Sequence, residues 1–203
     1  MALVAAMHFN LSDLTVDAQM ARIKASGAQA LINYNTGTAF GTALHGYTDV
    51  GLTIPLITQP AALAAGVMRQ YAQYLPPRLL ITGLIGDAPD SAPPGPVHNA
   101  VEAFDEACKA AGIDADHPTA LAWDPAMIVA TAFQQLGPDA SGPQINAFIA
   151  NLHGWYGING EYDFRSSPSG LTPNSIVMVR WDAQKKAFVS VTRPGGALIS
   201  AER

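Results

Sequence analysis

Short apolar segments alternate with helical patterns over the first 85 residues, and this alternation constrains the fold more than any other feature of the chain. The segments Ala30–Tyr34, Ile54–Thr58 and Leu79–Thr82 have the length and apolar character of strands that are covered on both faces. A stretch with helical spacing precedes each segment and ends at a glycine or a proline. This β-α-β-α-β-α-β rhythm predicts an α/β fold in which helices flank a mostly parallel sheet.

Apolar spacing also predicts where the helices lie. In the first 85 residues the expected helices are centred on Val16–Ile23, Phe40–Tyr47 and an Ala-rich stretch from about Ala61 to Leu75. After a Pro-rich loop at Gly83–Pro96, apolar stripes predict three more, at Val97–Cys108, residues 118–136 and Ile145–Leu152. Near the C-terminus, Ile176–Trp181 and Phe188–Val191 flank a polar turn and predict an antiparallel hairpin. We therefore divide the chain into three segments, 1–85, 86–154 and 155–203.

Composition excludes several classes of protein. Eleven basic residues against sixteen acidic ones give a net charge of −5, which argues against nucleic acid as a partner. Hydrophobic residues make up 49% of the chain, too many for intrinsic disorder. No uninterrupted apolar run approaches the ~20 residues of a membrane-spanning helix.

The residues that usually carry chemistry are scattered. A single cysteine excludes an internal disulfide, and the five histidines show no ligand spacing, so we expect no metal. Neither a dinucleotide fingerprint nor a phosphate-binding P-loop occurs, so we expect no cofactor. Cys108 lies on the apolar stripe of its helix, where we interpret it as a small buried hydrophobic residue. Without a nucleophile elbow, the chain is not expected to be an enzyme.

The most informative local feature follows the strand Ala30–Tyr34. Asn35, Thr36 and Thr38 stand between this strand and the next helix, where backbone N–H groups and hydroxyls favour an anion such as a small carboxylate. The alternative is that Thr36 or Thr38 simply caps the helix. Gln59 ends the next strand, so it belongs to the same edge of the sheet, where ligands of open α/β sheets bind.

Several stretches, read in order, support a family resemblance. They are Asp13–Ile32, Asn35–Thr38, Gly51–Pro55, Trp123-Asp124 and the Gly-x-x-Gly-x-Tyr-x-Phe run from Gly157 to Phe164. In this order they resemble the type I periplasmic solute-binding proteins of branched-chain amino-acid ABC transporters. Only the C-terminal half of that family is matched, because family members are considerably longer and begin with a signal peptide and an N-terminal lobe.

The resemblance gives each segment a place in the family's two-lobed fold. It makes residues 1–85 part of the second lobe and residues 86–154 the crossover with helices that return to the first lobe. Residues 155–203 become the C-terminal segment with its hairpin, and the N-terminal lobe is absent. The helix at 118–136 would then lack the sheet that it normally covers, so its apolar face is expected to be exposed.

The resemblance also implies a function and a set of ligand contacts. It implies a ligand-binding component, or a fragment of one, that delivers an amino acid or a similar small carboxylate or amide to an ABC permease. Its ligand contacts fall on Asn35, Thr36, Thr38 and Gln59. Gln59-Pro60 stands where family members that bind branched-chain amino acids have an acidic residue for the ligand's amino group. This difference leaves room for an aromatic acid, an amide or another small carboxylate.

Two points stay open at this stage. The family is periplasmic, but the apolar start of this chain lacks a basic region and stops at His8, so no complete signal peptide is expected. The alternative function is a non-transport small-molecule sensor or binding module with the same fold. That module would form a homodimer that hides the exposed apolar face.

Overall fold

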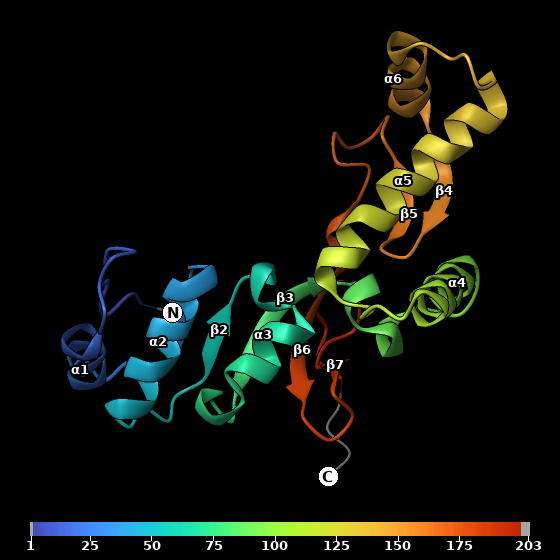
Figure 1. The fold of residues 1–203 in the computed structure, drawn as a ribbon. Helices are drawn as coiled ribbons and strands as arrows, with labels where there is room; N and C mark the ends of the chain where they lie inside the picture. The colour runs from blue at the N-terminus through green and yellow to red at the C-terminus, as the bar shows by residue number, and fades with distance from the viewer. Residues whose placement is uncertain (1, 200–203) are drawn as a thin grey trace. The chain divides into compact units, whose positions relative to one another are not determined.

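The structure, a computed structural model, describes residues 2–199 (Figure 1). It forms two compact units. Unit 1 comprises Met1–Thr82 and Arg180–Ala187, and unit 2 comprises Gly83–Val179 and Phe188–Arg203. Met1 and residues 200–203 are not among the described residues, so the ends of the expected segments 1–85 and 155–203 lie outside them.

Helices and strands alternate as the spacing predicted. The helices are α1 (Asp17–Ala25), α2 (Gly37–Asp49), α3 (Ala65–Gln70), α4 (Pro96–Ala111), α5 (His117–Leu136) and α6 (Gly142–Asn151). The strands are β1 (Leu31–Asn33), β2 (Leu56–Thr58), β3 (Leu79–Leu84), β4 (His153–Gly157), β5 (Gly160–Asp163), β6 (Ile176–Asp182) and β7 (Ala187–Ser190).

The central sheet has the strand order β1-β2-β3-β6-β7, and a second, two-stranded sheet pairs β4 with β5. Strands β1, β2 and β3 run parallel, and their register aligns Asn33 with Thr58 and Thr58 with Ile81. The carboxyl ends of these strands therefore lie along one edge of the sheet. This mostly parallel sheet with flanking helices confirms the predicted α/β fold, and β6 and β7 lie where a C-terminal hairpin was expected.

Unit 1 is held together by the apolar faces that the sequence indicated. Phe40 and Leu44 of α2 are buried, as are Leu56 of β2 and Ile81 of β3. A Cβ atom at Gly41 would lie 2.4 Å from the Tyr71 hydroxyl, so only glycine lets this ring pack directly on the helix. The ring of Tyr71 also meets that of Phe40 edge-on, at 6.4 Å between centroids.

Two parts of the first segment differ from the expectation. The predicted helix at 61–75 is broken into a 3₁₀ turn at Pro60–Ala62, the helix α3, and a second 3₁₀ turn at Ala72–Tyr74. The break has a local cause, because the Gln59 side chain binds the backbone of the first turn and starts it separately. The predicted rhythm also began with a strand, whereas none precedes α1 among the described residues.

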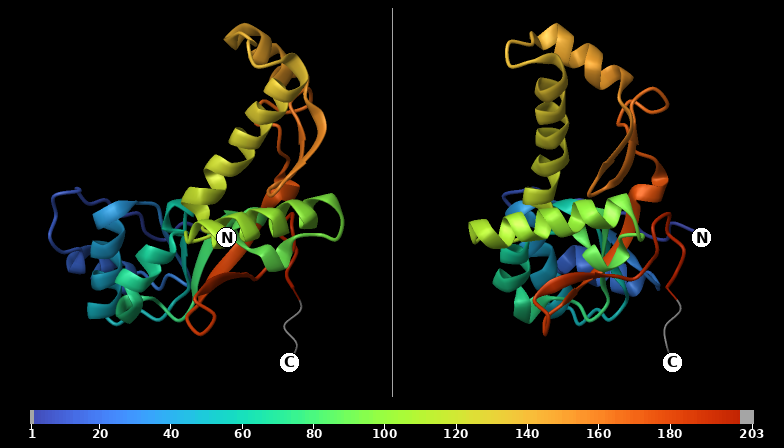
Figure 2. Two further views of the ribbon diagram at one scale, coloured as in Figure 1. Left: turned by 45° about the vertical axis from the view of Figure 1, so that its right-hand side comes forward. Right: turned by 90° about the vertical axis from the view of Figure 1, so that its right-hand side faces the viewer.

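Unit 2 packs α4 and α5 around a small apolar cluster. Val101, Phe104 and Cys108 of α4 meet Ala120 of α5 and Ile158 of the β4–β5 turn. Cys108 is 2% exposed, which confirms its interpretation as a buried hydrophobic residue. Helix α6 packs on α5, and the β4–β5 hairpin lies beside α5 (Figure 2). Periodicity did not predict this hairpin, because its strands are short and rich in glycine.

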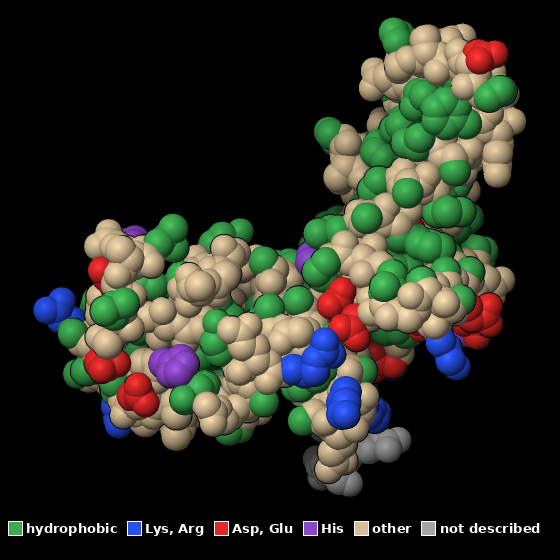
Figure 3. Space-filling view, in the orientation of Figure 1, with side chains coloured by type: hydrophobic (Ala, Val, Ile, Leu, Met, Phe, Trp, Pro, Cys, Tyr) green, Lys and Arg blue, Asp and Glu red, His purple; other side chains and the backbone are tan. Residues whose placement is uncertain are grey.

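The expected exposed face of the helix at 118–136 is present. Large apolar side chains of α5 that are at least one-third exposed are Leu121, Met127, Val129, Phe133 and Leu136. In the space-filling view, hydrophobic side chains gather over α5 and α6 (Figure 3). Among residues 2–199, no helix has both the length and the apolar character that crossing a bilayer requires.

Candidate functional site

The carboxyl ends of β1, β2 and β3 form a polar edge in unit 1. The Thr58 hydroxyl donates to the Asn33 carbonyl at 2.9 Å, and the Thr82 hydroxyl donates to the Thr58 carbonyl at 3.4 Å. These bonds tie the last residues of neighbouring strands together. We call the residues at this edge, Asn33, Asn35, Thr36, Thr38, Thr58 and Gln59, the carboxyl-end rim.

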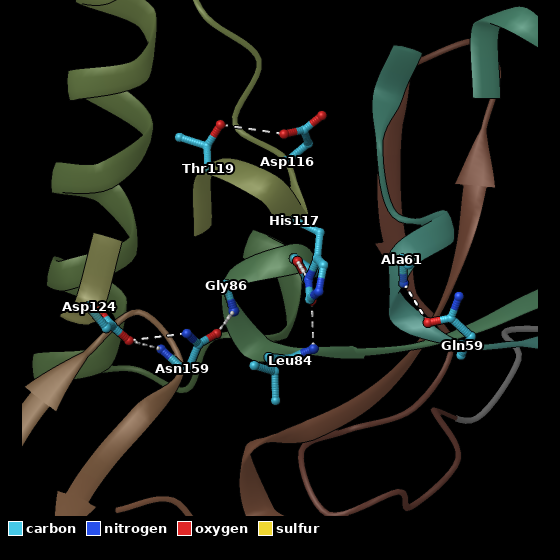
Figure 4. A network of polar contacts seen from close by, with 10 residues as sticks. Gln59, Ala61, Leu84, Gly86, Asp116, His117, Thr119, Asp124 and Asn159 are labelled. Carbon is cyan, nitrogen blue, oxygen red and sulfur yellow. Dashed lines mark hydrogen bonds and ion pairs between the residues drawn. The ribbon is translucent and has the colours of Figure 1, made fainter. Parts of the chain in front are cut away.

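Gln59 connects two loops of this rim. Its Nε2 atom donates to the Asn35 carbonyl at 2.9 Å, and its Oε1 atom accepts from the Ala61 backbone N–H at 2.9 Å (Figure 4). The structure thus brings Gln59 next to Asn35, as the shared edge predicted. One hydrogen of the Nε2 group remains beyond the bond to Asn35.

Thr36 and Thr38 stand at the start of α2 with exposed side chains. Thr36 is the N-cap residue, yet its hydroxyl makes no capping hydrogen bond. The geometry therefore does not support the alternative interpretation, in which the Thr36 side chain caps the helix. Within residues 2–199, neither threonine hydroxyl has a hydrogen-bonding partner, so both are available to a ligand or to water.

Two side-chain amides stand close to these threonines in the sequence, at Asn33 and Asn35. The Asn35 amide donates to Asn33 Oδ1 at 2.5 Å. Asn33 Nδ2 and Asn35 Oδ1 are buried and have no partner among the described residues. A buried amide group without a partner costs roughly 1–3 kcal/mol, so this end of β1 retains unused hydrogen-bonding capacity.

The chemistry of the rim is neutral and rich in hydrogen-bond donors. Its side chains are amides and hydroxyls, and the N-terminus of α2 adds backbone N–H groups with a favourable dipole for negative charge. The rim has no carboxylate that could pair with an ammonium group. Such an edge can bind a carboxylate or a carboxamide, whose oxygens accept hydrogen bonds.

A second polar centre lies in unit 2 and is built around Asp124 of α5, which is fully buried. Its carboxylate accepts hydrogen bonds from the backbone N–H of Ile158 at 2.9 Å and of Asn159 at 3.2 Å. The Asn159 side chain, at 3.1 Å, and the Tyr162 hydroxyl, at 2.9 Å, also donate to it. Three of these four donors belong to the β4–β5 turn and fix it to the middle of α5, and Figure 4 shows the contacts between Asn159 and Asp124.

Burial changes the pKa values of two groups in this centre, Asp124 and Tyr162. It raises the pKa of Asp124 above its usual value, although the four hydrogen bonds act in the opposite direction. Burial, and then the charge of Asp124, raises the pKa of Tyr162, which keeps its hydroxyl a donor. A Cβ atom at position 157 would lie 2.4 Å from Asp124 Oδ1, so Gly157 lets the turn approach the carboxylate.

The same network continues to the segment that follows β3. The Asn159 side-chain oxygen accepts from the Gly86 N–H at 3.2 Å. Asp87 contacts Nδ1 of His117, the first residue of α5, at 2.9 Å and accepts from the Leu84 N–H at 2.7 Å. The side chains that carry the network are all buried, and each forms a hydrogen bond. This unit 2 network, comprising Asp87, His117, Asp124, Asn159 and Tyr162, therefore has the features of a structural support.

Sequence reasoning did not single out this network as a site. The signal was nevertheless present, because Trp123-Asp124 and the run from Gly157 to Phe164 were two of the stretches that resembled the family. The structure shows that these two stretches bind one another. Among residues 2–199 no group of His, Cys, Asp and Glu side chains is arranged to hold a metal ion. Burial also raises the pKa of Cys108, which makes its thiol a poor nucleophile.

Comparison with known proteins shows to which family the chain belongs. A sequence profile of the periplasmic binding protein family matches residues 2–186. The chain belongs to this family. Among curated protein sequences, none matches it significantly.

Solved structures share the fold at low sequence identity. An extracellular ligand-binding receptor from Rhodopseudomonas palustris has a TM-score of 0.73 and 15% identity, over 91% of this chain and 54% of that one. The leucine-binding protein LivK from Thermotoga maritima has a TM-score of 0.70 and 17% identity, over 90% and 49%. LivJ from Streptococcus pneumoniae, solved with isoleucine, has a TM-score of 0.68 and 17% identity, over 90% and 50%.

This periplasmic binding protein therefore spans about half the length of the structures that it matches. At these identities the likeness establishes the fold. It is consistent with the order of elements that suggested the family from the sequence.

Proposed function

We propose that this chain forms the C-terminal half of a type I solute-binding receptor in the branched-chain amino-acid family. In this role it binds a small organic ligand and presents it to an ABC permease in the periplasm. No bond of the ligand is made or broken. Binding and release follow from opening and closing around the ligand.

One observation carries the proposal, namely the unused hydrogen-bonding groups of the carboxyl-end rim. The hydroxyls of Thr36 and Thr38 are exposed and have no partner among the described residues. They stand at the start of a helix that directly follows a parallel strand, which is where ligands of open α/β sheets bind. The family membership and the isoleucine found in LivJ support a small ligand of this kind.

We propose that Asn35, Thr36, Thr38 and Gln59 contact the ligand. The threonine hydroxyls donate to a carboxylate or carboxamide oxygen, and Gln59 adds the remaining hydrogen of its amide. The neutral rim disfavours a ligand whose ammonium group must be paired here. We therefore rank aromatic acids, amides and other small carboxylates ahead of free α-amino acids.

Calorimetric titration against three ligand classes tests this function. The panel comprises leucine and isoleucine, small aromatic carboxylates, and their carboxamides. We expect at least one acid or amide to bind, and the Thr36→Ala, Thr38→Ala double variant to lose affinity while keeping its far-ultraviolet dichroism. Thr131→Ala, which removes a hydroxyl of a half-buried residue of α5 that donates to the Met127 carbonyl, is the control outside the rim and should bind as the wild type does.

Two outcomes contradict the proposal. One is a folded protein that binds no member of any class. The other is binding that the double variant and the Thr131→Ala control retain equally, which would place the ligand away from the rim.

A further inference from the structure

A polar side chain occupies the buried position of β1. In this strand Leu31 is half-buried and Ile32 is exposed, whereas Asn33 is only 7% exposed. Burying an amide costs free energy unless its hydrogen bonds are made, and Asn33 Nδ2 has no partner among the described residues. An apolar side chain of similar size would avoid this cost. The burial of Asn33 therefore indicates a role other than stabilising the strand.

The bonds that Asn33 does make hold the start of the rim. Its Oδ1 atom accepts from the Asn35 side-chain amide at 2.5 Å, and its carbonyl accepts from the Thr58 hydroxyl at 2.9 Å. Gln59 donates to the Asn35 carbonyl at 2.9 Å. Asn35 is thus held through its side chain by Asn33 and through its backbone by Gln59. Each of these bonds joins two described residues of unit 1, so none of them depends on a segment outside the described chain.

Asn35 directly precedes the two threonines whose hydroxyls are unbonded. Thr36 and Thr38 are exposed, and neither hydroxyl has a partner among residues 2–199. Gly37 between them has a φ of 59°, a conformation that glycine adopts readily. Asn35 is therefore the residue next to these hydroxyls whose side chain and carbonyl are both held by hydrogen bonds.

We propose, on the basis of the proposed function, that Asn33 is a positioning residue for the ligand of the carboxyl-end rim and that its neutral amide allows the rim to accept an acid. Asn33 acts through Asn35, which sets where the Thr36 and Thr38 hydroxyls stand. A neutral side chain at this buried place also adds no repulsion toward an anion, whereas a carboxylate would. Asn33 thus affects both the affinity of the rim and its choice between an acid and an amide.

Two substitutions at Asn33 separate these effects. Calorimetry at pH 8 uses two matched acid–amide pairs as probes, benzoate with benzamide and isovalerate with isovaleramide. Asn33→Leu removes the acceptor for Asn35 and should weaken the acid and the amide alike, by about tenfold. Asn33→Asp keeps that acceptor but adds a negative charge, so it should weaken the acid by about tenfold or more and the amide by less than about threefold.

Stability distinguishes positioning from support. Since leucine fills the buried place without an unbonded amide, Asn33→Leu should unfold at an unchanged or higher urea concentration. Asn151→Asp is the matched control, because it adds the same charge at an exposed amide of α6 in unit 2, and it should bind as the wild type does. In the ligand-free wild type, the side-chain amide hydrogens of Asn35 should exchange with solvent more slowly than those of Asn151.

Several results would overturn the proposal. They are an Asn33→Leu variant with wild-type affinity for both members of a pair, a loss of affinity in that variant that comes with a loss of stability, and equal losses for acid and amide in Asn33→Asp. Asn35 amide hydrogens that exchange as fast as those of Asn151 would do the same. The proposed function survives these failures if the Thr36→Ala, Thr38→Ala double variant still loses affinity. A wild type that binds neither pair contradicts both.

Discussion

The carboxyl-end rim of unit 1 and the buried network of unit 2 are both polar, but their hydrogen-bonding groups are used in opposite ways. Around Asp124, every carboxylate oxygen meets a donor and the nearest backbone is held at close range. At the rim, the hydroxyls of Thr36 and Thr38 are unbonded within the described residues, and buried amide atoms nearby lack partners. The hydrogen-bonding groups around Asp124 are satisfied within the protein, whereas several of those at the rim are not.

The comparison separates polar groups that support the fold from polar groups that remain free to bind a ligand. A polar cluster that is fully bonded contributes to stability, and its loss should unfold the unit around it. A polar cluster with unbonded donors lowers the stability of the folded protein, and a ligand that accepts hydrogen bonds from those donors offsets this loss. The following predictions, ordered from the largest expected effect to the smallest, test this division.

The largest loss of stability is expected from Asp124→Ala. The substitution leaves four donors, three in the β4–β5 turn and the Tyr162 hydroxyl, without their acceptor inside a buried site. We expect the free energy of unfolding to fall by about 4 kcal/mol. Urea unfolding followed by tryptophan fluorescence measures it, since Trp123 and Trp155 lie next to the network. A loss below about 1 kcal/mol would contradict a supporting role.

Two histidine–carboxylate pairs, one buried and one exposed, should differ in their contributions to the stability of unit 2. Asp87 is 4% exposed and contacts His117, whereas Glu102 and His98 form an exposed pair at 3.2 Å. We expect Asp87→Ala to cost about 3 kcal/mol and Glu102→Ala less than about 0.5 kcal/mol. Thermal unfolding of both variants measures the difference. Equal costs would mean that burial does not set the strength of the Asp87 contact.

The pH dependence of stability should reflect the raised pKa of Asp124. Because burial raises its pKa in the folded state, the folded protein holds this proton more tightly than the unfolded chain does. The stability of the wild type relative to Asp124→Asn should therefore fall as pH rises above the ordinary carboxyl value of 3.8. Urea unfolding of both proteins across acidic pH measures this slope. A relative stability that rises with pH in this window would contradict the stated direction.

The smallest effect on stability is expected at the rim. Thr36→Ala and Thr38→Ala remove exposed hydroxyls that have no bonding partner within residues 2–199, so unfolding should change by less than about 0.5 kcal/mol. Each should weaken the binding of a carboxylate or amide ligand by roughly 0.5–1.5 kcal/mol. Calorimetry and unfolding on the same samples check both halves. Loss of stability without loss of affinity would place these threonines with the supporting residues.

Local periodicity predicted most of the fold. The apolar stripe of Phe40, Leu44 and Tyr47 faces the core as expected, and α5 begins within a residue of the expected start at 118. The helix expected at 61–75 was wrong in detail, because the Ala61 N–H donates to the Gln59 side chain and Tyr71 packs on Gly41, and apolar spacing reveals neither contact. The β4–β5 hairpin was missed because its strands are held by Asp124, which lies more than 30 residues earlier in the sequence.

The candidate site was partly accessible from sequence. A strand followed by Asn35-Thr36-Gly37-Thr38 and a helix is a local pattern, and the structure brings Gln59 against Asn35 as the shared edge implied. The unpartnered amide of Asn33 was not accessible, since it depends on burial and on which neighbours are within reach. The ionisation of Asp124 likewise depends on donors that come from another element.

The most direct test of the division between rim and network is a two-dimensional amide NMR titration with the tightest carboxylate or amide ligand of the panel. We expect the largest shifts at the amides of Asn35–Thr38 and Gln59, and little change at those of Ile158 and Asn159. Large shifts at Ile158 and Asn159, with an unchanged rim, would contradict this division.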